Sequence, residues 1–205
     1  GYELRAVPLT AEEVHNFYEG CSNEIIWPLF HDMQQMCNFL PEYWRTYREV
    51  NHKYARVAHD ASGAGDFVWV HDYHLMGVAA ELRRLGTEAR IGFFLHVPFP
   101  SSEVFRLLPQ RERLLEGMLG ADLVGFHTAG YLRHFASSAL RLFSVPTDVD
   151  RIRWGGREVR LGIFPMGIDA SLFSALAESP GVKALAEAHR ADGVRRLGGI
   201  DRLGF

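Results

Sequence analysis

Residues 68–100 read VWVHDYHLMGVAAELRRLGTEARIGFFLHVPFP, and this stretch decides the fold. Residues 67–70 form an apolar run of β-branched and aromatic side chains, which is typical of a buried strand. A helical pattern follows over residues 75–85 and ends at Gly86, where a left-handed cap is expected. A second apolar run covers residues 91–97. Strand, helix and strand in this order predict a βαβ unit with parallel strands and a right-handed crossover.

Polar side chains follow both of these strands. Asp72 lies directly after the first strand, and His96 lies at the end of the second. Alone, Asp72 would be read as a helix N-cap and His96 as a core histidine. Ligands of parallel sheets bind outside the carboxyl ends of the strands, so the two residues together predict a site. A carboxylate and an imidazole suit a hydroxyl-rich ligand, and Tyr18 and Trp27 are expected to be exposed aromatic residues that cover a sugar face.

The composition is that of a soluble globular protein. The chain has 205 residues, of which 47% are hydrophobic and 23% charged, with a net charge of −3. This length fits one large domain, or one domain and part of another. The charge favours neither nucleic acid nor an anionic membrane as a partner, and no apolar run reaches the ~20 residues of a membrane span. Cys21 and Cys37 are expected to be reduced thiols of a cytoplasmic protein.

Strands and helices alternate along the rest of the chain. This alternation predicts an α/β fold with a Rossmann-like, doubly wound parallel sheet. Pro28 is expected to interrupt any helix around it, and the Gly155-Gly156 pair predicts a hairpin turn. The further predicted strands cover residues 2–9, 121–126, 152–154, 159–164 and 195–203, and the further helices cover residues 11–19, 42–59, 101–108, 111–119, 129–143, 171–177 and 181–191.

Several other chemistries find little support in the sequence. His71, His74 and His96 could ligate zinc, but their spacing is not a specific zinc signature, so a metal-independent protein is favoured. The chain has no G-x-S-x-G nucleophile elbow, no G-x-G-x-x-G fingerprint and no Walker motif. Serine-hydrolase, nicotinamide and P-loop chemistry are therefore disfavoured.

Five motifs together resemble one known family. SNEIIWPLFH, VWVHDYHL, IGFFLHVPFPSSEVFRLLP, ADLVGFHT and FPMGID are similar, in order and spacing, to the glycosyltransferases of family 20 that make trehalose 6-phosphate. The resemblance runs from Tyr18 to Arg202. It implies the amino-terminal part of a two-domain GT-B fold. It also implies metal-independent transfer of glucose from UDP-glucose to glucose 6-phosphate, with retention at the anomeric carbon.

The resemblance also implies roles for individual residues. Tyr18, Trp27 and Asp72 match residues that bind the acceptor sugar phosphate. His96 matches a histidine that contacts the donor glucose, and Arg202 matches an arginine that stabilises the donor phosphates. A fixed guanidinium offsets the charge of a leaving nucleoside diphosphate without a proton transfer. On this view Asp72 and His96 are the catalytic residues, and positioning of two sugars is the main contribution of the protein.

The resemblance also predicts the domain organisation. Residues 1–180 are expected to form the acceptor-binding Rossmann-like domain, without its first strand and glycine-rich loop. Residues 181–205 are expected to be a linker and the start of a truncated nucleotide-sugar domain. Gly204 stands where the family usually has an aspartate. We therefore expect these 205 residues alone to be inactive.

Two alternatives stay open at this stage. The first is a related enzyme: glucosylglycerol-phosphate synthases, which use glycerol 3-phosphate as the acceptor, look very similar through these motifs, and pseudo-glycosyltransferases that join cyclitols share the fold. A non-catalytic sugar-phosphate-binding domain on the same scaffold is the other alternative. The expected partners are UDP-glucose and glucose 6-phosphate, together with a second copy of the chain in a homo-oligomer.

Overall fold

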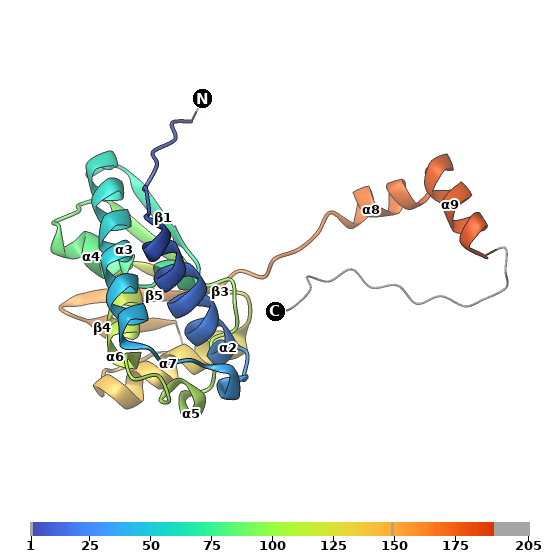
Figure 1. Ribbon diagram of the computed structural model, residues 1–205. Coiled ribbons are helices and arrows are strands. Elements are labelled where there is room, and N and C mark those ends of the chain that lie inside the picture. Colours follow the sequence, from blue (N-terminus) through green and yellow to red (C-terminus); the bar gives the residue numbers. More distant parts are fainter. Residues whose placement is uncertain (1, 149, 191–205) are drawn as a thin grey trace. The chain divides into compact units, whose positions relative to one another are not determined.

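The computed structural model describes residues 2–148 and 150–190, and a mostly parallel sheet forms the centre of the unit that ends at Pro165 (Figure 1). The sheet has the order β1-β2-β3-β5-β4. β1, β2, β3 and β5 are parallel to one another, and the edge strand β4 pairs antiparallel with β5. The strands are β1 (Phe67–His71), β2 (Arg90–Phe94), β3 (Leu123–Phe126), β4 (Arg151–Trp154) and β5 (Arg157–Ile163).

The predicted βαβ unit is present. β1 continues through α4 into β2, and Gly86 has the expected positive φ of 80°. The predicted hairpin also forms, because Gly155 and Gly156 adopt φ of 55° and 76° between β4 and β5. The helices between β1 and β4 are η3 (Tyr73–Leu75), α4 (Val78–Arg84), α5 (Ser102–Phe105), α6 (Arg111–Met118) and α7 (Ala129–Phe143).

One face of the sheet carries the core. Val70, Phe93, Val124 and Leu161 stand in one row across four strands, and all four are buried. In the next row Trp69 is 61% exposed. The parallel strands advance in one direction from β1 to β5, and right-handed crossovers then place their helices on the same face. The core therefore lies between this row and the helices.

Helix α3 (Pro41–Ala61) packs against α4 and against the amino-terminal helical segment (Figure 1). Two of its buried residues bond the chain that follows β1. Tyr47 Oη donates to the Tyr73 carbonyl over 2.7 Å, and Asn51 Nδ2 donates to the His74 carbonyl over 3.0 Å. Asn51 Oδ1 accepts from the Gly77 amide over 3.0 Å. α3 thus fixes the backbone immediately after Asp72.

The amino-terminal region differs from two predictions. Residues 2–10 form neither helix nor strand, because no described strand lies beside them to complete a ladder. The helix predicted for residues 11–19 instead continues to Phe30. Its pieces are α1 (Ala11–Glu13), the π-helical η1 (Val14–Ile26) and α2 (Trp27–Phe30), and the short η2 (Gln34–Met36) follows.

Pro28 was expected to break this helix, and that prediction was wrong. Pro28 lies in the first turn of α2, where the missing N–H costs little. The preceding turn is wide, since the Trp27 amide bonds the Ser22 carbonyl. Gly20 lets η1 approach α3, because a Cβ there would lie 2.6 Å from the Tyr43 ring.

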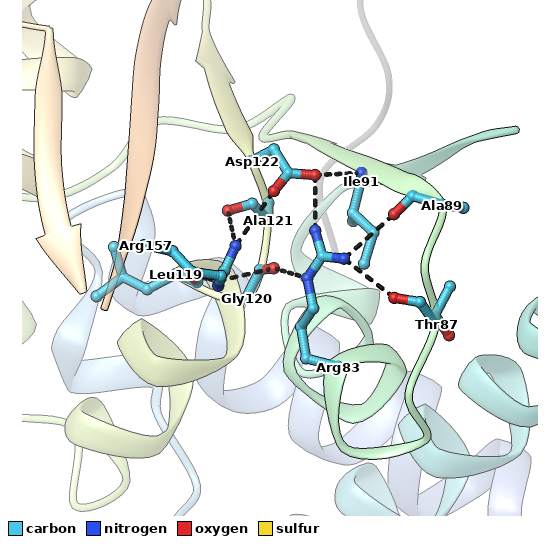
Figure 2. A network of polar contacts seen from close by, with 9 residues as sticks. All are labelled: Arg83, Thr87, Ala89, Ile91, Leu119, Gly120, Ala121, Asp122 and Arg157. Carbon is cyan, nitrogen blue, oxygen red and sulfur yellow. Dashed lines mark hydrogen bonds and ion pairs between the residues drawn. The ribbon is translucent and has the colours of Figure 1, made fainter. Parts of the chain in front are cut away.

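An arginine–aspartate network joins the amino ends of β2, β3 and β5 (Figure 2). Asp122 accepts from Arg83 Nη2 over 2.6 Å, from Arg157 Nη1 over 3.2 Å and from the Ile91 amide over 2.8 Å. The two guanidinium groups also bond carbonyls of the neighbouring loops, those of Thr87, Ala89, Leu119, Gly120 and Ala121. We call Arg83, Asp122 and Arg157 the amino-edge network.

The described residues fall into two units, which separate between Pro165 and Met166. The second unit contains α8 (Ala170–Ala177) and α9 (Pro180–Arg190). Asp169 caps α8, because its Oδ1 accepts from the Leu172 amide over 3.1 Å. The domain boundary at residue 180 remains a prediction. The strand predicted for residues 195–203 lies outside the described residues.

Candidate functional site

The candidate site lies at the carboxyl ends of the first three strands. β1 ends at His71, β2 leads to His96 through Leu95, and β3 leads directly to His127. Parallel pairing brings these three ends to the same edge of the sheet. We call the group of His71, Asp72, His96 and His127 the carboxyl-edge cluster.

Asp72 and His96 are in direct contact, as the sequence predicts. Asp72 Oδ1 accepts a hydrogen bond from the His96 amide over 3.1 Å. The Asp72 amide in turn donates to the Phe94 carbonyl over 2.8 Å. Asp72 makes no side-chain cap on the short helix η3 that follows it. Asp72 therefore occupies the N-cap position of η3 without capping it, and its carboxylate is held across the strand ends instead.

The backbone of Asp72 is strained. Its φ of 71° and ψ of 170° fall in a region that glycine occupies almost alone. Such a conformation costs about 1–3 kcal/mol and persists only where the surrounding structure enforces it. Here the bonds from Tyr47 and Asn51 of α3 hold the following residues. The strain directs the Asp72 carboxylate toward His96, and strain of this kind is concentrated at functional sites.

The His96 ring is held by two other histidines. His71 Nδ1 and His96 Nε2 are 2.9 Å apart, and the two rings stack with centroids 5.2 Å apart. The His127 ring meets His96 edge-on at 5.8 Å. Burial lowers the pKa of His96. The neighbouring rings of His71 and His127 lower this pKa further, whereas the charge of Asp72 opposes the shift. His96 is therefore a neutral imidazole at neutral pH, able to donate or accept one hydrogen bond at its free nitrogen.

His127 is the member of this cluster that the sequence reasoning missed. It stands in the quoted motif ADLVGFHT, directly after a predicted strand. The rule that selected Asp72 and His96, namely position at the carboxyl end of a parallel strand, applies to it equally. The available signal was its place in the topology.

Tyr18 is connected to the site through His74. The two rings stack 5.3 Å apart at an interplanar angle of 10°, and His74 packs on Tyr73 at 4.0 Å. Tyr18 remains 43% exposed. Burial lowers the pKa of His74, and its Nε2 makes no hydrogen bond with any described residue. Its ring therefore acts as an aromatic support beneath Tyr18.

Two further residues were predicted to belong to the site, Trp27 and Arg202. Trp27 lies on α2, is partly buried against the core and stacks on the His31 ring at 4.2 Å. It is therefore less open than the exposed aromatic surface that was predicted. Arg202 lies outside the described residues. The proposed roles of both stay predictions.

A zinc site of His71, His74 and His96 would require all three rings to coordinate the same ion. His74 is instead packed between the rings of Tyr18 and Tyr73. Within residues 2–148 and 150–190, no group of three or more histidine, cysteine or acidic side chains could hold a metal ion. Cys21 and Cys37, expected to be thiols, are both unpaired. Burial raises the pKa of the Cys21 thiol.

Comparison with known proteins decides the family. The model described as glycosyltransferase family 20 matches residues 1–203. This chain belongs to glycosyltransferase family 20. It is 46% identical over 184 residues to the bifunctional trehalose-6-phosphate synthase/phosphatase of Thermoproteus tenax, covering 89% of this chain and 25% of that protein. It is 42% identical over 211 residues to the UDP-forming alpha,alpha-trehalose-phosphate synthase of Schizosaccharomyces pombe, covering 99% and 41%.

Solved structures agree with the family and confirm the predicted fold, the Rossmann-like part of a GT-B glycosyltransferase. A structure described as trehalose-6-phosphate from E. coli bound with UDP-2-fluoro glucose has a TM-score of 0.82 and 33% identity, covering 88% of this chain and 41% of that chain. A synthase from Burkholderia xenovorans in complex with glucose-6-phosphate has a TM-score of 0.77 and 32% identity, covering 88% and 42%. This family 20 chain thus spans well under half the length of the relatives named here.

Proposed function

We propose that this family 20 chain is the acceptor-binding part of a trehalose-6-phosphate synthase. In this proposal the complete protein transfers glucose from UDP-glucose to glucose 6-phosphate and gives alpha,alpha-trehalose 6-phosphate with retention. The observation that carries the proposal is the contact between Asp72 and His96 at the carboxyl ends of β1 and β2. The names of the similar synthases support the choice of substrates.

Asp72 is proposed to bind acceptor hydroxyls. Its Oδ1 is engaged by the His96 amide, whereas its Oδ2 makes no hydrogen bond with the described part of the chain. An ionised carboxylate oxygen accepts a hydroxyl proton in a charge-assisted bond with defined direction. Tyr18, stacked on His74 and partly exposed, is proposed to cover the apolar face of the same sugar. Trp27 is proposed to extend this acceptor site.

His96 is proposed to contact the donor glucose. With Nε2 beside His71, its Nδ1 is the nitrogen left to meet a sugar hydroxyl. Its lowered pKa keeps the ring neutral, so that it orients the sugar without adding charge. Arg202 is proposed to stabilise the donor phosphates. The leaving phosphate takes the proton of the acceptor hydroxyl, so the reaction needs neither a metal ion nor a pair of glycosidase-type carboxylates.

We further propose that the protein is cytoplasmic and forms a homo-oligomer. The unpaired thiols of Cys21 and Cys37 fit a reducing compartment. No described helix is both long and apolar enough to cross a membrane. Light scattering of the complete protein tests the oligomer, and a mass equal to one chain would contradict it.

UDP release by the complete protein tests the proposed activity. The assay contains UDP-glucose and either glucose 6-phosphate or glycerol 3-phosphate. Release with glucose 6-phosphate is the expected result, and the 205-residue chain alone should release none. Release only with glycerol 3-phosphate would reassign the acceptor, and release with neither from a folded protein would indicate a non-catalytic binding domain.

A further inference from the structure

A pocket lies between α3, α4 and α6, and no residue of the carboxyl-edge cluster lines it. Its volume is about 240 Å³. Beside this space α6 packs closely on the chain that leads into α4, because Gly117 has no side chain. A Cβ on Gly117 would lie 2.3 Å from the Met76 carbonyl oxygen. We call this space the arginine pocket, and the side chains used below are Trp44, Arg48, Glu81, Arg84 and Arg113.

Positive charge dominates the arginine pocket. Three guanidinium groups and one carboxylate line it, in a chain whose net charge is −3. Glu81 pairs with Arg84, and Arg113 pairs with Glu116 over 2.8 Å. Arg48 makes no ion pair or hydrogen bond with any described residue. The two ion pairs offset part of the charge of Arg84 and Arg113, whereas the charge of Arg48 is left to attract an anion.

An aromatic side chain, Trp44, lines the pocket together with the arginines. Trp44 lies one helical turn before Arg48 on α3, and its ring stacks on Tyr47 at 5.5 Å with an angle of 17°. Guanidinium groups bind phosphoryl oxygens through paired, charge-assisted hydrogen bonds. We propose that the arginine pocket binds a small phosphorylated molecule, with its phosphoryl group between the arginines and its remainder against Trp44.

The same pocket touches the supports of the candidate site. Tyr47 and Asn51 line it, and they also bond the chain after Asp72. Tyr47 Oη accepts from the Met76 amide over 3.2 Å, and Asn51 Oδ1 accepts from the Gly77 amide over 3.0 Å. A ligand in the pocket therefore contacts the two side chains that hold the strained segment. This part of the inference concerns regulation and rests on the proposed function, whereas binding itself does not.

Phosphate titration of the ¹⁵N-labelled 205-residue chain, followed by NMR at constant ionic strength, tests the pocket. Inorganic phosphate should shift the Trp44 indole N–H and the Met76 and Gly77 amides in a saturable way. Arg48→Gln should weaken the apparent affinity about tenfold, the loss expected for one charge-assisted contact. Arg133→Gln is the matched control, because Arg133 is exposed on α7, and its affinity should stay within about twofold.

Two results would overturn the proposal. One is a shift that grows linearly without saturation, and the other is equal affinity in the wild type and Arg48→Gln. A second titration with phenyl phosphate separates the two sources of a phosphoryl group. Tighter binding than inorganic phosphate would identify an organic phosphomonoester stacked on Trp44, and equal binding would identify free phosphate. The first result supports the whole proposal, whereas the second overturns the contact of the ligand with Trp44. Neither result depends on glucose transfer.

Discussion

The two edges of the parallel sheet differ in how they use charged side chains. At the amino edge, Asp122 accepts from Arg83, Arg157 and a backbone amide, and the arginines also bond loop carbonyls (Figure 2). At the carboxyl edge, Asp72 has a strained backbone, and one of its carboxylate oxygens accepts a single hydrogen bond, from the His96 amide. Charges that are fully partnered stabilise the fold, whereas charges with unused hydrogen-bonding capacity serve a ligand. Variants at the two edges should therefore separate stability from activity.

The largest expected effect is on activity at the carboxyl edge. His96→Ala in the complete protein should lower kcat for UDP release about 100-fold, the loss typical of a contact to the reacting sugar. The urea midpoint should change little, because the Asp72 carboxylate bonds the backbone amide of residue 96 rather than the ring. Steady-state kinetics and urea unfolding measure both quantities. A large fall in the urea midpoint with unchanged kcat would reverse the roles of the two edges.

The next effect is on stability at the amino edge. Asp122→Ala removes the acceptor of two guanidinium groups and of the Ile91 amide, and should cost about 2 kcal/mol of unfolding free energy. The Asp122 side chain is 41% exposed, so the ion pairs are partly screened. Urea unfolding measures the loss. Glu158→Gln, which breaks an exposed pair with Arg151, is the control and should cost under about 0.5 kcal/mol.

The third prediction separates strain from chemistry at Asp72. Glycine adopts a positive φ without strain, whereas alanine does not. The free energy of unfolding should therefore be about 1–3 kcal/mol higher for Asp72→Gly than for Asp72→Ala. Both variants lose the carboxylate, and both should lose acceptor binding in the complete protein. Urea unfolding and the KM for glucose 6-phosphate are the measurements. Equal stability of the two variants would show that the backbone of residue 72 is unstrained.

The smallest effect is a pH dependence confined to the carboxyl edge. Burial lowers the pKa of both His74 and His96 in the folded chain. Because the unfolded state then binds more protons, stability is fully present above a pH of about 6.5 and falls as the pH decreases below it. His74→Phe should flatten part of this decline in urea midpoints between about pH 7 and pH 5. A decline identical to that of the wild type would exclude His74 as its source.

The local patterns of the sequence predicted much of the fold. The βαβ unit, the left-handed Gly86 and the Gly155-Gly156 hairpin turn all depend on residues close together in the chain, and all three are present. The strand predicted near the amino terminus failed because a strand requires a partner, which local alternation does not supply. Pro28 was misjudged because a proline is tolerated in a first turn, and the π-helical segment before it left no visible signal.

The candidate site was predictable in its location but not in its contacts. Parallel topology alone placed Asp72 and His96 at one edge. The hydrogen bond between them, the positive φ of Asp72 and the support of Tyr18 by His74 depend on tertiary packing. Trp27 was expected to be exposed, yet its ring packs on His31 and the core. A sequence pattern gives no information about such burial.

The most direct test of the account is a crystal structure of the complete protein with glucose 6-phosphate. The account predicts that sugar hydroxyls lie within hydrogen-bond distance of the Asp72 carboxylate, with the Tyr18 ring against the sugar. The phosphate-bearing sugar should also lie at the carboxyl edge and away from the amino-edge network. A glucose 6-phosphate found elsewhere, with Asp72 and Tyr18 untouched, would contradict the assignment of the carboxyl edge as the acceptor site.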